Sequence, residues 1–330
     1  MRVLVTGGAG FIGSRFAKQL VAAGEDVVVL DKLTYSGNLA NLAGADVDFV
    51  EGDICDADAV EAAASGCDAV VNFAAETHVD RSIFGAAPFI ETDVLGTYVL
   101  LDWARRTGAR FVQVSTDEVY GDVPAGSSSR EDDPLRPSSP YSASKAGGDL
   151  QVLAAVRTYG VDASITRGSN TYGANQYPEK ILPLFVTNAL DGEPLPLYGD
   201  GGQMRDWLHV DDHCSGVELV LREGRSGEIY NVAANEEVEN VELTRRILAL
   251  TGRDESLVRH VADRAGHDRR YSLDTTKLRA LGWAPTRTFG DGLRETVEWY
   301  RDNRAWWEPI KRSSDYREYY DRQYAARLSA

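Results

Sequence analysis

Short runs of apolar residues alternate with stretches of helical periodicity through the first half of the chain. The runs have the length of buried strands, and the stretches between them repeat apolar residues at helical spacing. We predict strands at residues 2–6, 27–30, 47–50, 68–73, 110–114 and 163–167. Because strands that alternate with helices pair in parallel, the pattern predicts an α/β fold with a doubly wound parallel sheet, covered by helices on both faces.

The pattern changes after residue 167, where prolines become frequent. Helices are predicted at residues 241–250 and 289–301, and residues 228–232 form one more buried strand. We expect this strand to return to the main sheet. The predicted organisation is a sheet-based domain over residues 1–167, completed by the strand near residues 228–233, and a smaller, interleaved lobe over residues 168–330.

The turn after the first strand has the glycine spacing of a dinucleotide-binding loop. Gly7, Gly10 and Gly13 separate the strand from a helix predicted over residues 14–23. Glycine permits a tight turn, and it lets the backbone approach a pyrophosphate at a helix N-terminus. The second strand leads into Asp31, whose carboxylate can bind a ribose 2′-hydroxyl and would repel a 2′-phosphate. The sequence therefore predicts a Rossmann domain that binds NAD in preference to NADP, although Lys32 weakens that preference.

Composition limits the classes of partner. The 330 residues carry a net charge of −16, so we expect no binding to nucleic acid or to an anionic membrane. An anionic substrate would have to meet individual basic residues. No stretch has the roughly 20 apolar residues of a membrane-spanning helix. Cys55, Cys67 and Cys214 are odd in number and far apart, which fits buried thiols in a reducing cytoplasm.

Tyr141 and Lys145 are four residues apart where a helix is predicted, so they share one face of it. A nearby ammonium lowers the pKa of a phenol, which is ordinarily near 10, so the tyrosine could take a proton from a sugar hydroxyl. Thr116 lies at the end of a predicted strand, 25 residues earlier. Such a pair is often a surface coincidence, but its position after an NAD-binding pattern favours a catalytic role.

At these residues the chain resembles the extended short-chain dehydrogenase/reductase family and, within it, the dTDP-glucose 4,6-dehydratases. The resemblance covers nearly the whole chain. Its motifs are residues 7–13, 31–35, 74–82, 116–118, 141–145, 167–170, 178–180, 205–207 and 266–270. The Thr116-Asp117-Glu118 triplet is the specific part, because related epimerases and decarboxylases lack the paired acids there.

The resemblance implies an NAD-dependent hydro-lyase that acts on a nucleotide-activated hexose, with dTDP-glucose as the expected substrate. C4 would be oxidised, water eliminated across C5 and C6, and hydride returned to C6, which gives a 4-keto-6-deoxy sugar. Tyr141 would take the O4 proton while Thr116 orients O4. Glu118 would be the base for C5–H, and Asp117 the acid for the C6 hydroxyl. A solvated acidic turn is the alternative for this acid pair.

The resemblance also implies the binding residues. Expected cofactor contacts are Gly7, Gly10, Phe11, Ile12, Gly13, Asp31, Lys32, Leu33, Thr34, Asp53, Ile54, Ala74, Ala75, Thr92, Tyr141 and Lys145. Expected substrate contacts are Thr77, Thr116, Asn170, Lys180, Pro196, Tyr198, Arg205, Asn240, Arg264 and His267. Arg205 and Arg264 suit a diphosphate, although each could be a surface salt-bridge partner. Asp93 departs from the family pattern, which has asparagine there.

Several alternatives stay open. Within the family, a 4-epimerase or a decarboxylase would not need the acid pair, and a catalytically silent NAD-binding protein would not need Tyr141 and Lys145. The sequence does not separate dTDP from UDP. His209 and His213 have a spacing that could ligate a metal, but we identify no third ligand and predict no metal site. A homodimer is expected because the family packs the helices at residues 92–106 and 142–158 into a four-helix bundle.

Overall fold

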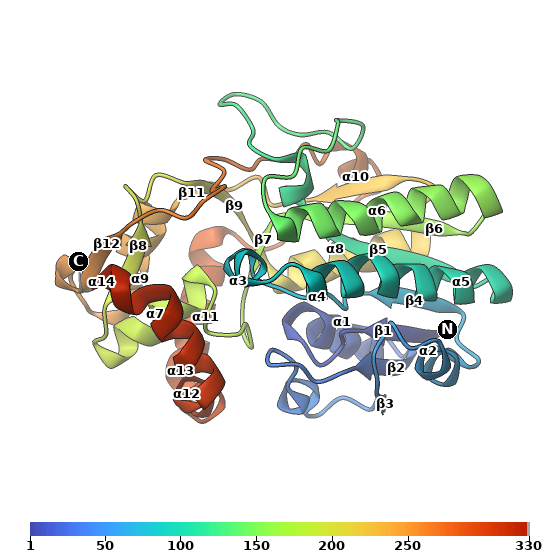
Figure 1. Ribbon diagram of the computed structural model, residues 1–330, viewed down its shortest axis with the longest axis horizontal. Coiled ribbons are helices and arrows are strands. Elements are labelled where there is room, and N and C mark those ends of the chain that lie inside the picture. The colour runs from blue at the N-terminus through green and yellow to red at the C-terminus, as the bar shows by residue number, and fades with distance from the viewer. Residues whose placement is uncertain (329–330) are drawn as a thin grey trace.

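The computed structural model describes residues 1–328 and has a seven-stranded sheet at the centre of its larger part (Figure 1). The strand order is β10-β6-β5-β4-β1-β2-β3, and every neighbouring pair is parallel. The strands are β1 (Arg2–Thr6), β2 (Asp26–Asp31), β3 (Asp48–Glu51), β4 (Ala69–Asn72), β5 (Arg110–Thr116), β6 (Ala163–Gly168) and β10 (Ile229–Val232). The predicted doubly wound α/β fold is confirmed. The chain changes direction across the sheet between β1 and β4, where such folds bind their ligands.

Helices cover both faces of this sheet. On one face α1 (Phe11–Ala22) packs against α8 (Val210–Glu223), and on the other α5 (Thr97–Thr107) packs against α2 (Ala57–Ala64) and α6 (Pro140–Tyr159). Successive strand residues point to opposite faces. Val3 and Val5 therefore join the core under α1 and α8, whereas Leu4 joins the core under α5 and α6. Burial on both faces explains why the strands read as nearly continuous apolar runs.

The helix predicted at residues 92–106 is present, but its first five residues have π-helical geometry. Two short helices, α3 (Val79–Phe84) and α4 (Ala87–Ile90), lead into a π-helix, η2 (Glu91–Gly96), and α5 follows. The backbone of η2 lies directly against α6. A Cβ atom at Gly148 would stand 2.7 Å from the carbonyl oxygen of Asp93, so only glycine allows this approach.

The second half of the chain builds a smaller part around its own core. One sheet contains β7 (Asn170–Tyr172), β9 (Met204–His209) and β11 (Glu237–Glu239), and another contains β8 (Leu195–Tyr198) and β12 (Val258–Val261). Helices α7 (Ile181–Asp191), α9 (Asn240–Thr251) and α11 (Phe289–Asp302) pack together beside these strands. The two predicted helices are confirmed, and the predicted return of a strand to the main sheet is β10, which pairs with β6.

The end of the chain folds back onto this smaller part (Figure 1). It consists of α12 (Arg304–Arg312), α13 (Ser314–Tyr320), a π-helix η5 (Asp321–Ala325) and α14 (Ala326–Leu328). A separate short helix, α10 (Thr276–Ala280), precedes α11 and lies beside β10. Trp307 is fully buried and its indole donates to the carbonyl of Tyr300 at 2.7 Å. Tyr316 donates to the carbonyl of Pro178 at 2.9 Å. The first contact ties the tail to α11, and the second ties it to the loop before α7.

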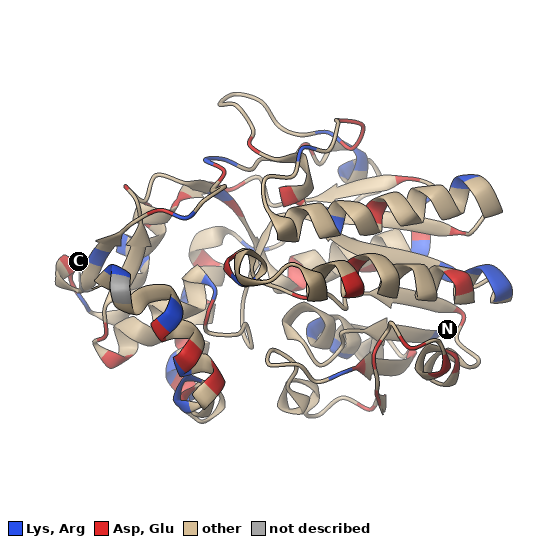
Figure 2. Cartoon of the chain, in the orientation of Figure 1, with Lys and Arg blue, Asp and Glu red and all other residues tan. Residues whose placement is uncertain are grey.

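Charged residues of both signs are interspersed over both parts of the molecule (Figure 2). The net charge of −16 is therefore not confined to one segment. Over residues 1–328, we find no helix with both the length and the apolar character needed to cross a membrane.

Candidate active site

A cavity of about 310 Å³ lies at the carboxyl ends of the central strands, where loops of the second half meet them. It gathers most of the residues predicted for cofactor, chemistry and substrate. Those that line it are Gly7, Gly10, Phe11, Ile12, Gly13, Asp31, Lys32, Thr34, Asp53, Ile54, Ala74, Ala75, Thr77, Thr92, Thr116, Asp117, Glu118, Tyr141, Lys145, Asn170 and Lys180.

The glycine loop is shaped for close contact with a ligand. Gly7 has a φ of +65°, and a Cβ atom there would lie 2.6 Å from the backbone nitrogen of Ala74. Gly10 caps α1 without any side-chain hydrogen bond to the first turn. The first amides of α1 therefore face the cavity uncapped, and the positive end of the helix dipole lies there too. This end of the cavity fits the pyrophosphate of a dinucleotide.

Asp31, the last residue of β2, is hydrogen-bonded to the same loop. Its two carboxylate oxygens accept hydrogen bonds from the backbone of Ala9 at 2.9 Å and of Leu33 at 2.8 Å. Burial raises its pKa, and the two amides oppose that effect. Leu33 does not line the cavity. It has a φ of +51° and contributes through its amide to the position of Asp31.

Lys32 is held between two carboxylates. Its ammonium lies 3.3 Å from Glu76 and 3.5 Å from Asp53, and it also donates to the hydroxyl of Thr92 at 3.4 Å. Its charge is therefore compensated locally, which reduces the attraction it could offer to a 2′-phosphate. The doubt that Lys32 raised about NAD preference is correspondingly smaller.

The acid pair follows β5 in a short 3-10 helix, η3 (Asp117–Tyr120). Thr116 caps η3, because its hydroxyl accepts from the amide of Glu118 at 3.2 Å, and it donates to Asp117 at 3.0 Å. Asp117 is only 3% exposed, and its second oxygen has no hydrogen-bond partner among residues 1–328. Burial, together with the adjacent Glu118, raises the pKa of Asp117 to about 8. Asp117 is thus a neutral acid at neutral pH and can donate a proton.

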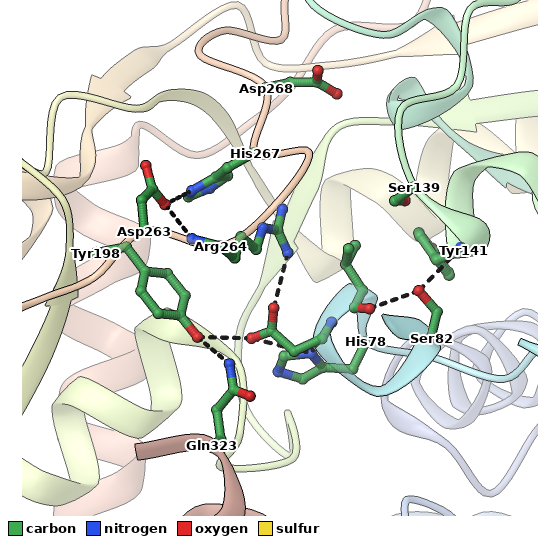
Figure 3. Close-up of polar contacts among 12 residues, drawn as sticks. His78, Ser82, Ser139, Tyr141, Tyr198, Asp263, Arg264, His267, Asp268 and Gln323 are labelled. Carbon is green, nitrogen blue, oxygen red and sulfur yellow. Dashed lines mark hydrogen bonds and ion pairs between the residues drawn. The ribbon is translucent and has the colours of Figure 1, made fainter. Parts of the chain in front are cut away.

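Tyr141 and Lys145 lie in the first turns of α6. Ser82 accepts a hydrogen bond from the amide of Tyr141 at 3.1 Å and so fixes this end of the helix (Figure 3). Lys145 donates to the carbonyl of Val114 at 3.0 Å and lies 3.8 Å from Asp93. The predicted sharing of one helix face is confirmed, since both side chains line the cavity.

The charge around Tyr141 differs from the prediction. Its side chain faces the cavity, yet desolvation by the surrounding protein raises the pKa of its phenol well above 10, and the carboxylates of Glu118, Asp93 and Asp117 raise it further. The predicted net lowering of the pKa is therefore wrong for the chain alone, because burial, and after it the three acids, favour the neutral phenol. A bound cation beside the phenol would shift the balance the other way.

A second group of predicted residues lies outside the cavity lining, in a hydrogen-bonded network around Asp80 of α3. Asp80 accepts from the phenol of Tyr198 at 2.9 Å and from Arg264 at 3.5 Å. Gln323, from the C-terminal tail, also donates to Tyr198 (Figure 3). Arg264 keeps a buried Nε atom without a partner among residues 1–328. Its guanidinium therefore retains capacity for an acidic ligand.

His267 and Arg205 have fewer free hydrogen-bonding groups for a substrate than expected. His267 hydrogen-bonds Asp263 at 2.6 Å, and burial lowers its pKa to about 4, so it is neutral (Figure 3). Arg205 is 5% exposed and donates to the carbonyls of Met204 at 2.8 Å and Asp268 at 2.9 Å. Arg205 thus braces the loop that carries His267.

The remaining predicted residues lie in the second half and away from the cavity lining. Pro196 pairs with Arg259 in the register of β8 and β12. Asn240 is the first residue of α9, and its buried amide oxygen has no partner among residues 1–328.

The cavity also contains residues that were not predicted as catalytic, cofactor or substrate contacts. They are chiefly Ser115, Gly168, Ser169, Thr171, Gln176, Trp207 and His213. The register of β5 and β6 places Gly168 beside Thr116, so the predicted parallel sheet could have indicated it. His213 hydrogen-bonds Thr171 at 2.7 Å, and burial lowers its pKa to about 4. His209 instead caps α8 through the amide of Asp211, so the two histidines serve separate local contacts.

Comparison with known proteins agrees with this site. The family model described as GDP-mannose 4,6 dehydratase matches residues 4–296. A dTDP-glucose 4,6-dehydratase from Streptomyces niveus is 56% identical over 323 residues, which cover 94% of this chain and 96% of that protein. The crystal structure of DesIV, a dTDP-glucose 4,6-dehydratase from Streptomyces venezuelae solved with NAD and dTDP, is 57% identical with a TM-score of 0.92 and covers 94% of this chain and all of that one.

A relative with a different reaction has the same fold. The UDP-glucose 4-epimerase of Thermus thermophilus, solved with NAD, is 35% identical with a TM-score of 0.87, and the match covers 92% of this chain and all of that one. The family match and the much higher identity to dehydratases over almost the whole length show that the chain belongs to the GDP-mannose 4,6-dehydratase family of nucleotide-sugar enzymes.

Proposed function

We propose that this protein is an NAD-dependent hydro-lyase that converts dTDP-glucose into its 4-keto-6-deoxy derivative. The observation that carries the proposal is the acid pair: a buried, neutral Asp117 beside Glu118, in one cavity with Tyr141 and a dinucleotide-type glycine loop. The dTDP-glucose 4,6-dehydratases from Streptomyces support the substrate, since they share over half of the chain's residues.

The proposed cofactor site extends from the glycine loop to Lys145. The uncapped first turn of α1 would bind the pyrophosphate, Asp31 the adenine-side ribose, and Lys145 the ribose next to the reacting ring. Bound NAD⁺ supplies a hydride acceptor for C4 and, once reduced, a hydride donor for C6. Because the same cofactor is restored in each turnover, the chain has no need to release it.

In the proposed reaction Tyr141 takes the proton from O4 while C4 is oxidised. Its raised pKa shows that a phenolate is costly in the chain alone. The positive charge of the oxidised cofactor and the ammonium of Lys145 would both favour the phenolate. Thr116, whose hydroxyl lies at the end of β5, would orient O4.

The acid pair would carry the elimination of water. A ketone at C4 acidifies C5–H, so Glu118 can remove that proton. Asp117 would donate its proton to the departing C6 hydroxyl, which requires the protonated form that burial favours. The two neighbouring acids would thus have opposite roles because their surroundings differ.

A local group of cations would bind the diphosphate in this otherwise acidic chain. Lys180 lines the cavity, and desolvation lowers its pKa although the carboxylates of Glu179 and Glu118 oppose that effect. Arg264 has an unpartnered Nε atom among residues 1–328. A diphosphate would satisfy both groups. Pro196 and Tyr198, both in β8, would then contact the nucleobase of the substrate.

The test is incubation of the purified protein with dTDP-glucose and, in parallel, UDP-glucose. We expect the base-induced ultraviolet absorbance of a 4-keto sugar with dTDP-glucose and no net accumulation of NADH. A Glu118→Gln variant is the matched control, because it should still reduce bound cofactor but should not incorporate deuterium at C5 from deuterated water. Formation of a C4 epimer without loss of water would contradict the proposal and favour the epimerase reaction of the Thermus relative. Absence of any NADH signal or product would favour a silent NAD-binding protein.

We also propose that the protein forms a homodimer through α6 and the helical segment made of η2 and α5. Large apolar side chains on this face are exposed, including Leu95, Tyr98 and Leu150, at 48%, 55% and 56%. Their neighbours Val99, Leu153 and Val156 pack instead against the core. Exposed apolar residues on adjacent helices support a second copy as the partner. Light scattering of the parent and a Leu150→Glu variant would show a dimer and a monomer, respectively.

Two further predictions stay proposals. A cytoplasmic location is supported by Cys55, Cys67 and Cys214, which form no disulfide within residues 1–328 and are buried or half-buried. The division into residues 1–167, with a strand near 228–233, and residues 168–330 is supported by the separate cores of the two parts. The cavity is lined from both parts, so the proposed site needs both.

A further inference from the structure

Asp93 is a buried carboxylate that contacts the catalytic helix from outside it. It lies in the π-helix η2, is 1% exposed, and has one oxygen 3.8 Å from the ammonium of Lys145. The other oxygen accepts a hydrogen bond from Ser144 at 2.6 Å. No role of Asp93 follows from the reaction derived above, since it donates nothing to the substrate.

The backbone is arranged so that this carboxylate reaches Lys145. Gly147 and Gly148 lie on the side of α6 that faces η2, and a Cβ atom at either would lie within 2.8 Å of η2 atoms. A π-helix carries an extra residue in its turn, which changes the direction in which its side chains project. The two features together bring Asp93 against the first turns of α6.

Lys145 is held at two points. Its ammonium donates to the carbonyl of Val114 at 3.0 Å, and Asp93 is the one carboxylate paired with it among residues 1–328. The oxygen of Asp93 that faces Lys145 has no hydrogen-bond partner among those residues. The contact is thus an ion pair rather than a hydrogen bond, and it acts through charge and position.

We propose that Asp93 is a positioning residue that holds Lys145 at the end of β5 and that its negative charge sets the pH at which Tyr141 can lose its proton. This inference rests on the proposed role of Tyr141 as the base. The carboxylate opposes phenolate formation, and the cofactor's positive charge must overcome that opposition. Asp93 thereby adds to the effect of burial in keeping Tyr141 protonated until the cofactor is bound.

Each charged group near Tyr141 or Asp93 favours one protonation state of that residue. On Tyr141, Glu118 and Asp117 act from η3 and Asp93 from η2, and all three favour the neutral phenol. On Asp93, Lys145 from α6 favours the carboxylate, whereas Glu76, after β4, and Asp149, on α6, oppose it. Burial dominates and raises the pKa of Asp93 to about 6. Asp93 is therefore charged at the slightly alkaline pH where a tyrosine base would work.

The test measures Tyr141 directly, without substrate. With saturating NAD⁺, ultraviolet absorbance near 295 nm is titrated with alkali, and the curve of each protein is compared with that of its Tyr141→Phe version. We expect Asp93→Asn to move the ionisation of Tyr141 to lower pH, by about one pH unit for removal of one nearby charge. Asp93→Ala removes the same charge and should give the same shift. If one of the two variants fails to fold, the other still tests the inference. Ser144→Ala is the control, because it removes the hydrogen bond but keeps the charge, and it should leave the ionisation in place.

A second measurement connects the cluster to turnover. The pH dependence of cofactor reduction is followed at 340 nm after mixing with dTDP-glucose, and its acid limb should move to lower pH in Asp93→Asn. The inference would be overturned if Tyr141 ionised at the same pH in the parent and in the Asp93 variants. It would also be overturned if Asp93→Asn lowered the rate of cofactor reduction at every pH without moving the acid limb of the pH profile. A shift at 295 nm with no cofactor reduction in the parent would support the inference about Asp93 and contradict the proposed dehydratase function.

Discussion

Replacement of Asp117 by asparagine should remove dehydration and, at the same time, stabilise the fold at alkaline pH. The pKa of Asp117 is raised from 3.8 to about 8 by burial and by Glu118. Between those values the folded state retains a proton that the unfolded chain has released. The free energy of unfolding of the parent therefore falls as pH rises through this range. Asparagine cannot ionise, so the variant lacks this loss.

The size of the effect follows from the shift. Stability changes by about 1.4 kcal/mol per pH unit for one group that holds its proton only in the folded state. From pH 6 to pH 8, Asp117→Asn should therefore gain about 2 kcal/mol relative to the parent. An acid with a pKa near 8 is about nine-tenths protonated at pH 7, whereas an ordinary aspartate is protonated in fewer than about one molecule in a thousand. The same burial that costs stability thus keeps the proton available.

The assay is urea unfolding of the parent and Asp117→Asn at pH 6, 7 and 8, together with single-turnover elimination at each pH. Glu118→Gln serves as the reference, because loss of the neighbouring charge should move the inflection of the parent curve to lower pH. The same dependence of stability on pH in parent and Asp117→Asn would refute the reasoning. Elimination by Asp117→Asn at the parental rate would show that another group protonates the C6 hydroxyl.

Three further outcomes are expected. Tyr141→Phe should slow cofactor reduction roughly 10²–10⁴-fold in stopped-flow absorbance at 340 nm, and reduction at the parental rate would assign the base elsewhere. Asp31→Asn should weaken NAD⁺ binding and narrow the preference over NADP⁺ in calorimetric titrations, because the charge is lost while the Ala9 amide keeps an acceptor; an unchanged ratio of affinities would contradict this. Asp149→Asn should lower the free energy of unfolding by about 3–5 kcal/mol in urea, because the fully buried Arg167, 2.9 Å away, loses its counter-ion; a loss under about 1 kcal/mol would show that this pair is not needed.

The main sheet and the cofactor end could be predicted because burial dictates their sequence directly. A parallel strand covered on both faces must be apolar throughout, as at Val3 to Val5, and the glycine loop must avoid the backbone of Ala74. Both constraints are local, so they appear in the sequence as continuous patterns.

The second half could not be predicted in the same detail. β8 and β9 mix proline, charged and aromatic residues, and their pairing partners are distant in sequence, so no period distinguishes them from loops. The contacts around the active site could not be predicted from the sequence either. Sequence identifies Asp80 and Asp93 as acids, but only the fold shows that each is buried against a basic residue. The error about Tyr141 has the same origin, since its burial, and after it the approach of three acids from other elements, arises only in the fold.

The return of β10 to the sheet has a consequence for how the protein is made. β6 ends at Gly168, yet its outer neighbour begins only at Ile229, after the intervening residues have built part of the smaller lobe. A growing chain on the ribosome therefore presents the edge of β6 unpaired until this later segment emerges. Exposed strand edges pair readily with other chains, and partly synthesised chains are prone to such contacts. Ribosome stalling before β10 has emerged from the exit tunnel should leave nascent chains dependent on chaperones, whereas stalling after Val232 has emerged should allow nascent chains to close their sheet.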